Sequence, residues 1–409
     1  MIKQRNEHTY QTVLDTLEKR LRERAPGRIQ LVTGPRQVGK TTLLLAIQKT
    51  FGSRALYAPA DGTESSLPGW WERLWQKING MAERHRAILL IDEIQHVPEW
   101  SQRLKAEIDK IYREGRRVHI VVTGSSALHL GQGSIESLAG RFERLHLLHW
   151  PLIEMAQRLR RSVSFAADLF IRYGCYPGAL KFLKDEDRWK AYVRDSIVEP
   201  AIGRDIMAME TIRKPALLRQ IFAVCAGHPA EIVSLQKIRG LLHDRGALAT
   251  VSHYLEVIEE ASLVSPVRKY SDKVIRRRAS PPKLIVLNNA ILSSMGNSSP
   301  ADRNDDPTRW GRWVENACIA HAWNAGQKIY YWREEPLEVD VLIDGNWGRW
   351  ALEIKTGSFT THELRGLLEF CRRHDSFRPI VLCDEEHVAI PRQAGVDAMP
   401  WRKFLAGEE

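Results

Sequence analysis

One stretch decides the fold of this chain: Gly34, Pro35, Arg36, Gln37, Val38, Gly39, Lys40, Thr41 and Thr42. It matches the pattern G-x-x-x-x-G-K-[ST], which is typical of a phosphate-binding loop, at every fixed position. An apolar, strand-like run (Ile29 to Val32) precedes it, and an apolar, helix-like run (Leu43 to Ile47) follows it. In this context the backbone N–H groups of the loop and of the helix N-terminus point at one anion. The nine residues are therefore predicted to form a nucleotide-binding P-loop.

Two side chains of this loop have predicted tasks of their own. Lys40 would reach the β- and γ-phosphates of the nucleotide, and the hydroxyl group of Thr41 would bind Mg²⁺. The chain has no N/T-K-x-D run to read guanine, so the sequence favours ATP over GTP.

A second motif supplies two acids. The run Ile88-Leu89-Leu90-Ile91 leads directly into Asp92 and Glu93, as in a buried parallel strand whose carboxyl end enters an active site. Asp92 would hold Mg²⁺ through water. Glu93 would orient or deprotonate the attacking water, because positioning that nucleophile is most of the catalysis in ATP hydrolysis.

A third strand-like run, His119 to Thr123, ends in Gly124-Ser125-Ser126. Small hydroxyl groups at the end of such a strand suit a polar sensor of the γ-phosphate. Thr123 or Ser125 is the expected residue, and a plain turn is the alternative.

The composition describes a large globular chain. Its 409 residues exceed the size of one ordinary core, so two or three domains are expected. It has no run of about 18 apolar residues, which predicts no membrane span, and its polar first residues lack a signal-peptide core. We therefore expect a cytoplasmic protein. The five cysteines show no C-x-x-C spacing, which argues against a zinc site or a disulfide framework.

The order of apolar runs predicts three parts. Residues 28–150 alternate strand-like and helix-like runs, which implies a mostly parallel, helix-covered sheet. The expected strands are Ile29–Thr33, Ala55–Ala58, Ile88–Asp92, His119–Thr123 and Leu145–His149. Helical periodicity then dominates until a polar, turn-rich segment at 298–307, and a second α/β unit follows it. The predicted domains are 1–155, 156–300 and 301–409.

Several runs of the sequence match one family. They are GPRQVGKTTLL (34–44), LLIDEIQHVPEW (89–100), VVTGSSALHL (121–130), LAGRFERLHLLHWPLIEM (138–155), YGCYPGAL (173–180) and SHYLEVIEEASLV (252–264). Through these runs, nearly the whole chain resembles bacterial and archaeal AAA-type ATPases that carry a C-terminal domain of uncharacterised function. The resemblance implies a P-loop ATPase with a helical middle and a nuclease-like C-terminal domain.

Two arginines, Arg141 and Arg144, follow the third strand. An arginine here could serve a neighbouring subunit of a homo-oligomer as a finger, contact the γ-phosphate within its own chain, or only form a salt bridge. Arg141 is the favoured residue. As a catalytic group it would be essential for turnover but not for nucleotide binding.

Residues 216–280 fit a winged-helix arrangement. Three helical patterns (216–226, 234–243 and 250–262) precede a strand-like run, a basic turn and a second strand near 283–287. In this module the third helix enters the major groove and the wing contacts the DNA backbone. The basic residues of segment 268–278 fall on the predicted wing: Arg268, Lys269, Lys273, Arg276, Arg277 and Arg278.

This position favours DNA as a partner, with a merely solvated face as the alternative. The third helix carries three acids, Glu256, Glu259 and Glu260, which would repel phosphates. That helix could pack against protein instead and leave the wing as the sole contact. Binding would then be independent of base sequence and strongly dependent on salt.

The C-terminal part contains a predicted hairpin, with arms at 338–343 and 349–355. If Asn346 and Trp347 form the centre of the turn, Asp340 lies opposite Glu353. Glu338 then lies opposite Lys355. Opposed residues share one face, and two opposed carboxylates cost energy unless a cation lies between them.

This is the D…E-x-K pattern of the PD-(D/E)XK nuclease-like fold, which the family resemblance also implies. Glu315, on the preceding helix 310–323, matches the acid of the first helix of that fold. Glu315, Asp340 and Glu353 would hold Mg²⁺ or Mn²⁺, and Lys355 would steer or activate water. Three interpretations stay open: an active nuclease, an inert nuclease-like domain that binds DNA or protein, and a surface hairpin with ion pairs.

The sequence thus predicts an α/β P-loop ATPase of the AAA type with a winged-helix middle and a restriction-endonuclease-like C-terminal domain. It would use ATP and Mg²⁺, and Mn²⁺ could serve the C-terminal site. The leading hypothesis is a DNA-associated ATPase in DNA processing or defence. The alternative is a signalling ATPase whose C-terminal domain binds a protein partner.

Overall fold

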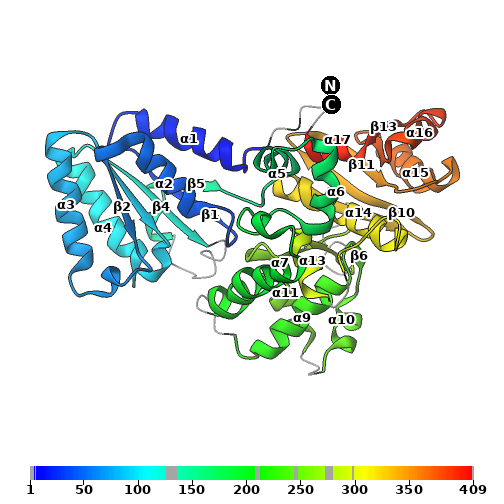
Figure 1. Ribbon diagram of the computed structural model, residues 1–409, viewed down its shortest axis with the longest axis horizontal. Helices are drawn as coiled ribbons and strands as arrows, with labels where there is room; N and C mark the ends of the chain where they lie inside the picture. Colours follow the sequence, from blue (N-terminus) through cyan, green and yellow to red (C-terminus); the bar gives the residue numbers. More distant parts are fainter. Residues whose placement is uncertain are drawn as a thin grey trace. The chain divides into compact units, whose positions relative to one another are not determined.

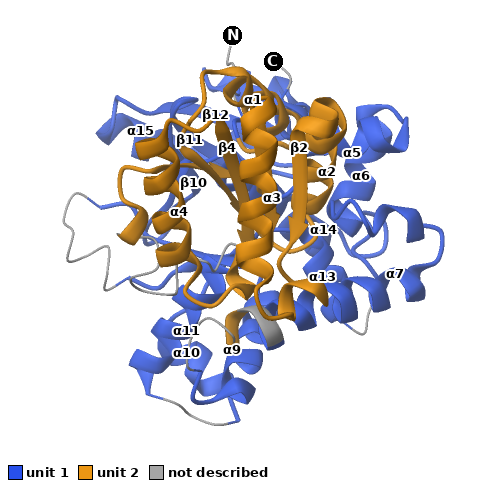
Figure 2. Ribbon diagram, turned by 90° about the vertical axis from the view of Figure 1, so that its left-hand side faces the viewer, with its two compact units in different colours: residues 1–7, 149–204, 212–409 blue, residues 8–148, 205–211 orange. Residues whose placement is uncertain are grey.

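The structure is a computed structural model that describes residues 4, 6–125, 136–207, 212–243, 247–271, 280–296 and 299–407. Figure 2 shows two compact units. The N-terminal unit (unit 2 in Figure 2) comprises residues 8–148 and 205–211, and the C-terminal unit (unit 1) comprises residues 1–7, 149–204 and 212–409. The helical middle and the C-terminal α/β segment therefore share one unit. Among the described residues, no helix has the length and apolar character needed to cross a membrane.

The N-terminal unit is built on a five-stranded parallel sheet with the order β2-β3-β4-β1-β5. Its strands are β1 (Ile29–Gly34), β2 (Ala55–Pro59), β3 (Ala87–Asp92), β4 (Val118–Ser125) and β5 (Phe142–His146). The first four agree with the predicted strands to within two residues. The fifth begins three residues before the predicted strand. It is an edge strand, half-buried throughout, so its polar residues gave no apolar run.

Helices cover both faces of this sheet (Figure 1). Helices α1 (Tyr10–Arg22) and α2 (Lys40–Phe51) pack on one face, and α3 (Trp70–Arg84) and α4 (Trp100–Glu114) pack on the other. Alternate residues of the central strands enter the two apolar clusters, because successive side chains of a strand point to opposite faces. All of β1, β3 and β4 is consequently buried.

The strand order places the predicted site. Strand β4 lies between β1 and β3, so its last residues lie between the P-loop and the acids that end β3. At the start of the loop, a Cβ atom on Gly34 would lie 1.9 Å from the carbonyl oxygen of Leu147. No other residue type fits there without moving the backbone, so the close packing of the loop requires this glycine.

The first part of the C-terminal unit is mainly helical. It contains α5 (Leu152–Leu159), α6 (Val163–Tyr173), α7 (Glu186–Val193), α9 (Pro215–Gly227), α10 (Leu235–Leu241), α11 (Leu248–Glu260) and α13 (Asn289–Met295). A small antiparallel sheet joins them, with the order β6-β8-β7: β6 (Glu231–Ile232), β7 (Val264–Val267) and β8 (Lys283–Val286). The wing predicted between β7 and β8 lies outside the described residues from position 272 to position 279.

The rest of this unit is a second sheet with the order β13-β12-β11-β10-β9. Its elements are α14 (Pro307–Asn324), β9 (Lys328–Glu334), β10 (Leu337–Gly345), β11 (Gly348–Ile354), α15 (Arg365–Arg373), β12 (Arg378–Cys383), α16 (Ala389–Gln393), β13 (Asp397–Pro400) and α17 (Trp401–Ala406). Strands β9 to β11 are antiparallel, and β11 to β13 are parallel. The hairpin pairs Val341 with Leu352 and Gly345 with Gly348, which confirms the register predicted from its turn.

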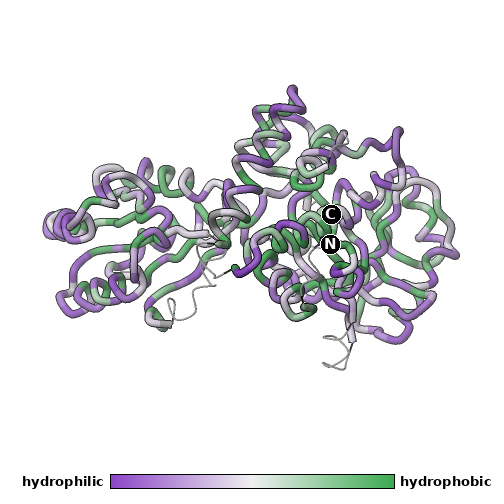
Figure 3. Tube along the Cα trace, turned by 90° about the horizontal axis from the view of Figure 1, so that it is seen from below, coloured by the Kyte–Doolittle hydropathy of each residue, from purple (hydrophilic) through white to green (hydrophobic). Residues whose placement is uncertain are grey.

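Buried polar contacts join the two sheets of the C-terminal unit. Asn316 of α14 is fully buried; its amide accepts a hydrogen bond from the backbone N–H of Val286 at 2.9 Å and donates one to the carbonyl oxygen of Val286 at 2.8 Å. Beyond β7, the backbone N–H of Tyr270 donates to the carbonyl oxygen of Tyr331 on β9 at 2.7 Å. Figure 3 shows hydrophobic segments running through the interior of each unit. The small sheet is thus fixed to the five-stranded sheet of the same unit rather than linked to it loosely.

Candidate functional site

A cavity of about 320 Å³ lies at the carboxyl edge of the parallel sheet. Residues from the P-loop, β2, β3 and β4 line it: Arg36, Gln37, Gly39, Lys40, Thr41, Thr42, Tyr57, Asp61, Asp92, Glu93 and Ser125. The structure therefore brings the predicted loop and both predicted acids around one space. The other three loop residues, Gly34, Pro35 and Val38, do not line this cavity.

The loop conformation depends on two residues with positive φ. Gln37 has φ 63° and Gly39 has φ 105°, and α2 begins at the next residue, Lys40. The Lys40 side chain is buried, and its ammonium group donates to the carbonyl oxygens of Gly34 at 3.0 Å and Pro35 at 2.9 Å. The lysine is thereby held against the loop that would surround the phosphates. The N-terminus of α2 lies at the same loop, and a helix N-terminus favours a bound anion.

A hydrogen-bond network holds the two acids at the end of β3. The hydroxyl group of Thr123 donates to one carboxylate oxygen of Asp92, and the backbone N–H of Glu93 donates to the same Thr123 oxygen at 3.1 Å. Thr123 is fully buried and does not line the cavity, whereas Ser125 does. Thr123 is thus a positioning residue for the acids, and of the two predicted sensor residues Ser125 is the one that faces the nucleotide space.

Tyr57 completes the environment of Asp92. Its hydroxyl group donates to the second Asp92 oxygen at 3.0 Å. Partial burial and the negative charge of Asp92 raise the pKa of Tyr57 above its usual value, so it stays a neutral donor. Both oxygens of the Asp92 carboxylate are consequently oriented by neighbouring hydroxyl groups.

The oxygen atoms around this cavity fit a magnesium ion that accompanies a nucleotide. Mg²⁺ is bound by hard oxygen ligands and usually keeps several waters, with one or two protein groups and phosphate oxygens. The hydroxyl group of Thr41 and the carboxylate of Asp92 line the same cavity, so both are available for this role.

The two predicted arginines lie elsewhere in the sheet. Arg141 forms a bidentate ion pair with Asp109 of α4, with Nε–Oδ1 at 2.6 Å, and its carbonyl oxygen accepts from the backbone N–H of Ile29. Ile29 begins β1, so Arg141 is at the amino edge of the sheet, opposite the cavity. Arg144 pairs with Leu31 in the middle of β5, and burial lowers the pKa of its guanidinium group. Of the three predicted roles of Arg141, the observed contacts show the salt bridge, and they place no arginine from this segment at the nucleotide cavity.

A second polar cluster lies in the C-terminal unit. Glu315 of α14 and Asp340 of β10 both approach Lys283, which comes from β8. The Lys283 ammonium nitrogen lies 2.5 Å from a carboxylate oxygen of Glu315 and 3.6 Å from one of Asp340. It lies 3.6 Å from Glu338 and donates to the carbonyl oxygen of Asp340 at 3.1 Å. The other two residues of the predicted site, Glu353 and Lys355, form an ion pair with each other at 2.8 Å.

Burial and the neighbouring charges together determine the protonation of this cluster. Burial alone would lower the pKa of Lys283, but the charges of Glu315, Asp340 and Glu338 outweigh it and raise that pKa above its usual value. The ammonium group therefore stays charged. Burial also raises the pKa of Glu315 and of Glu353 well above the usual range of a carboxyl group, and the neighbouring charge of Asp340 adds to both shifts.

The predicted metal ligands do not fit a divalent ion in this arrangement. Glu315 and Asp340 are turned toward an ammonium group that is only 2 % exposed, and a metal ion cannot share that position with it. A second carboxylate oxygen of Asp340 accepts from the backbone N–H of Ile354 at 2.8 Å. The structure thus brings together the residues of the predicted nuclease pattern and places a lysine, absent from that pattern, between them.

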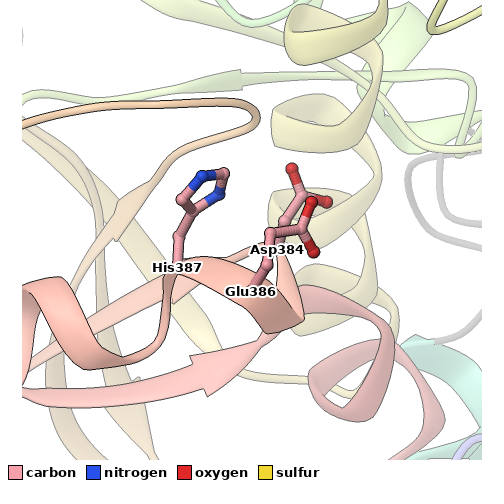
Figure 4. A group of neighbouring side chains, drawn as sticks. All are labelled: Asp384, Glu386 and His387. Carbon is pink, nitrogen blue, oxygen red and sulfur yellow. The ribbon is translucent and has the colours of Figure 1, made fainter.

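The described part of the chain contains one other group with metal-ligand spacing: Asp384, Glu386 and His387. Figure 4 shows the two carboxylates next to each other. Asp384 is fully buried and already accepts from Trp401 Nε1 and from the backbone N–H of Gly357, each at 2.9 Å. Arg303 bonds both carboxylates, at 3.1 and 3.2 Å. These partners account for the group as a structural ion-pair cluster.

Of the predicted basic segment 268–278, the structure describes residues 268–271. The backbone groups of Arg268 and Tyr270 pair with Tyr331 of β9, so the segment that follows β7 is joined to the five-stranded sheet of the same unit. On α11, Glu259 accepts a hydrogen bond from the Ser265 hydroxyl group at 2.6 Å, and burial raises its pKa. Glu259 therefore faces β7 rather than an external partner. Lys273, Arg276, Arg277 and Arg278 lie outside the described residues.

Comparison with known families agrees with the nucleotide site. Residues 26–156 match the family model of an AAA domain, and residues 166–302 and 310–404 match two domains of unknown function. By fold and by family match, the N-terminal unit is of the AAA type. The match covers the P-loop, both acids of β3 and the third strand.

Two relatives match most of this chain, and both are named as uncharacterized proteins. An uncharacterized protein of Mycobacterium tuberculosis and one of Mycobacterium bovis are each 25 % identical over 348 residues, which is 83 % of this chain and 72 % of the relative. Among solved structures, AMPPCP-bound DnaA from Aquifex aeolicus has a TM-score of 0.32 at 15 % identity and covers 62 % of this chain and 92 % of its own. The Aeropyrum pernix ORC1 protein in complex with DNA has a TM-score of 0.31 at 16 % identity, over 70 % of this chain and 90 % of its own. Scores this low do not establish a common overall fold.

Sequence reasoning missed residues at both sites. In the AAA-type unit, Tyr57 lies within β2 and Asp61 follows that strand. The carboxyl ends of parallel strands meet at one edge, so the predicted strand already indicated this region. Lys283 carried no such signal. It begins an apolar strand, where a lysine ordinarily marks an exposed end, and only the packing of two sheets reveals its partners.

Proposed function

We propose that this chain binds Mg²⁺-ATP in the cavity of its AAA-type unit and hydrolyses it. The observation that carries the proposal is that Lys40, Thr41, Asp92, Glu93 and Ser125 line a single cavity of about 320 Å³. These residues supply a phosphate-binding cation, two oxygen ligands for magnesium, a base and a hydroxyl donor. Hydrolysis of a phosphoanhydride requires all of these functions and little covalent chemistry from the protein.

Each residue has a distinct task in this proposal. The loop N–H groups and Lys40 bind the phosphates, while Thr41 and Asp92 would hold the magnesium ion, which neutralises charge on the phosphate oxygens when it is bound. Glu93 orients the attacking water and accepts its proton. Thr123 keeps Asp92 and the backbone of Glu93 in position, and Ser125 donates to the γ-phosphate.

The direct test compares the wild type with a Lys40→Ala variant. We expect the variant to lose ATP turnover and to bind ATP more weakly, because it lacks the ammonium group that would contact the β- and γ-phosphates. Turnover would be followed by release of inorganic phosphate, and folding of the variant by circular dichroism. A folded variant with normal turnover would refute the assignment of the site.

We propose nucleic-acid association as a second function, supported by one feature of the C-terminal unit. The order α9, β6, α10, α11, β7, β8 with a three-stranded antiparallel sheet is that of a winged helix, and the basic segment 268–278 follows β7. Because Glu259 of α11 faces its own sheet, the contact would be made by the basic segment through phosphates. Such binding weakens steeply with salt and reads little base sequence.

ATP turnover measured with and without single-stranded, duplex and branched DNA separates this function from its alternative. Stimulation by one DNA form at moderate salt supports a DNA-coupled ATPase. Turnover that no DNA changes favours a regulatory ATPase whose C-terminal unit binds a protein partner. A metal-dependent nuclease is not part of the proposal, because Lys283 lies among the predicted metal ligands.

A further inference from the structure

We propose that Lys283 replaces the divalent cation of the carboxylate cluster and that, while it is in place, the C-terminal unit binds no Mg²⁺ or Mn²⁺ there and cleaves no nucleic acid. The cluster would be a closed cation site whose occupant is part of the chain. This inference is independent of ATP hydrolysis, since none of its residues lies in the N-terminal unit.

The contacts of the ammonium group are those expected of a bound cation. Four oxygen atoms surround it: Oε1 of Glu315 at 2.5 Å, the carbonyl oxygen of Asp340 at 3.1 Å, and carboxylate oxygens of Asp340 and Glu338 at 3.6 Å. An ammonium group has three donors and no acceptor, so it is satisfied by such a set. Two of these carboxylates, Glu315 and Asp340, are among the three predicted metal ligands.

The backbone fixes Lys283 in this place. It pairs with Val267 of β7 on one side and with Ile232 of β6 on the other. The chain just before the strand is held as well, because the hydroxyl group of Tyr331 donates to the carbonyl oxygen of Pro281, two residues before Lys283. The Lys283 side chain is 2 % exposed. A lysine in the central strand of a small sheet, enclosed in this way, has no free path to solvent.

Charge balance explains why the lysine belongs to the cluster. Four acids (Glu315, Glu338, Asp340 and Glu353) lie there, and Lys355 and Arg333 neutralise only Glu353 and the outer oxygen of Glu338. Buried carboxylates without a cation are costly. Removing the Lys283 ammonium group therefore leaves Glu315 and Asp340 facing each other with a vacated space between them, which is the requirement for a divalent ion.

The experiment measures Mn²⁺ binding to nucleotide-free full chain by electron paramagnetic resonance of free Mn²⁺. Four proteins are compared: wild type, Asp340→Asn, Lys283→Ala, and the double variant Lys283→Ala with Asp340→Asn. The Mn²⁺ bound by the Asp340→Asn protein is subtracted from that bound by the protein with Asp340, once with Lys283 present and once with Lys283→Ala. This difference excludes any Mn²⁺ bound at the P-loop. We expect no Asp340-dependent site in the wild type and one such site in Lys283→Ala, with an affinity at least tenfold higher than in the double variant.

Thermal unfolding gives an independent readout, because Mn²⁺ should raise the melting temperature of Lys283→Ala and not that of the wild type. Lys283→Met keeps the volume of the side chain and serves if Lys283→Ala does not fold. Two results would overturn the proposal. One is Asp340-dependent Mn²⁺ binding by the wild type, which needs a folded Asp340→Asn protein but no Lys283 variant. The other is a folded Lys283 variant that binds no more Mn²⁺ than the wild type.

Discussion

The hydroxyl group of Thr123 links the two acids of the ATPase site: it donates to the carboxylate of Asp92 and accepts from the backbone N–H of Glu93. Glu93 has φ 53°, a left-handed conformation that is unfavourable for a residue other than glycine. One buried side chain thus orients the Asp92 carboxylate, the proposed magnesium ligand, and stabilises the backbone turn at Glu93, the proposed base.

This relationship predicts how Thr123 variants behave. Thr123→Val keeps the shape but removes both hydrogen bonds, and we expect the turnover number to fall about 10- to 100-fold, or about 1.4–2.7 kcal/mol in activation free energy. ATP affinity should change by less than about threefold, since the phosphates contact the loop and not Thr123. Steady-state kinetics with direct nucleotide titration measure both. Thr123→Ser should restore most of the rate, and a valine variant with normal turnover would contradict the positioning role.

Arg141 gives the opposite prediction. Because it pairs with Asp109 at the amino edge of the sheet, Arg141→Ala should retain turnover within about twofold. Stability should change little, as expected for an ion pair that solvent screens. Asp109→Ala is the matched control and should behave alike. Loss of turnover in Arg141→Ala alone, at normal nucleotide binding, would restore a finger role in a neighbouring subunit.

We predict that the C-terminal unit loses stability in acid because it contains the buried residue His149. It is fully enclosed; its Nε2 lies 3.0 Å from the carbonyl oxygen of Ser262, and its Nδ1 lies 3.2 Å from the amide nitrogen of Asn288. The Asn288 side-chain oxygen accepts from Ala290 N–H, so the amide nitrogen is the group that faces the ring and donates to it. The neutral ring therefore carries its proton on Nε2.

Burial lowers the pKa of His149 to about 4. The unfolded chain, with a pKa near 6.5, binds this proton more readily than the folded chain, so stability is complete above about pH 6.5 and falls as the pH drops toward 4. At pH 5 the loss is about 2 kcal/mol. Denaturant unfolding of wild type and His149→Asn at pH 7 and pH 5 tests this. The variant should lose less stability between the two pH values, and an equal loss in both proteins would refute the assignment.

We predict that replacing two helical glycines by alanine changes stability in opposite directions. A Cβ atom on Gly366 of α15 would lie 2.1 Å from the carbonyl oxygen of Glu338 on β10, whereas one on Gly80 of α3 would meet nothing within 4 Å. Gly366→Ala should cost about 1–3 kcal/mol because the helix must move away from the sheet. Gly80→Ala should stabilise the N-terminal unit by about 0.5–1 kcal/mol, since alanine restricts the unfolded chain. Thermal unfolding of both variants measures the pair, and equal shifts would show that the close contact is unimportant.

The sequence could predict that the residues of the proposed ATPase site meet at one cavity, because each of its motifs is local. A P-loop is one continuous segment, and the acids follow a strand whose apolar run is unmistakable, so Lys40 and Asp92 were placed by pattern alone. The hairpin register around Asp340 was also predicted, since the turn between its arms determines which residues face each other.

The remaining features depend on contacts between distant segments. The roles of Arg141 stayed open until α4 placed Asp109 beside it. Likewise, Lys283 of β8 and Asp340 of β10 belong to different sheets, with α13, α14 and β9 between them in the chain. Nothing in the strand of Lys283 indicates an acidic partner. Patterns that show which residues share a strand do not show which strand supplies the counter-charge.

The most direct test of the central claim is the fate of ATP in a Glu93→Gln variant compared with the wild type. ATP hydrolysis would be measured with Mg²⁺ at saturating nucleotide, and bound nucleotide would be identified after rapid gel filtration. If Glu93 is the base of the cavity, the wild type releases ADP and phosphate, while Glu93→Gln binds ATP with similar affinity and retains it unhydrolysed, with turnover reduced at least about 100-fold. A variant that hydrolyses ATP at the wild-type rate, or a wild type that binds ATP and never hydrolyses it, would contradict the account.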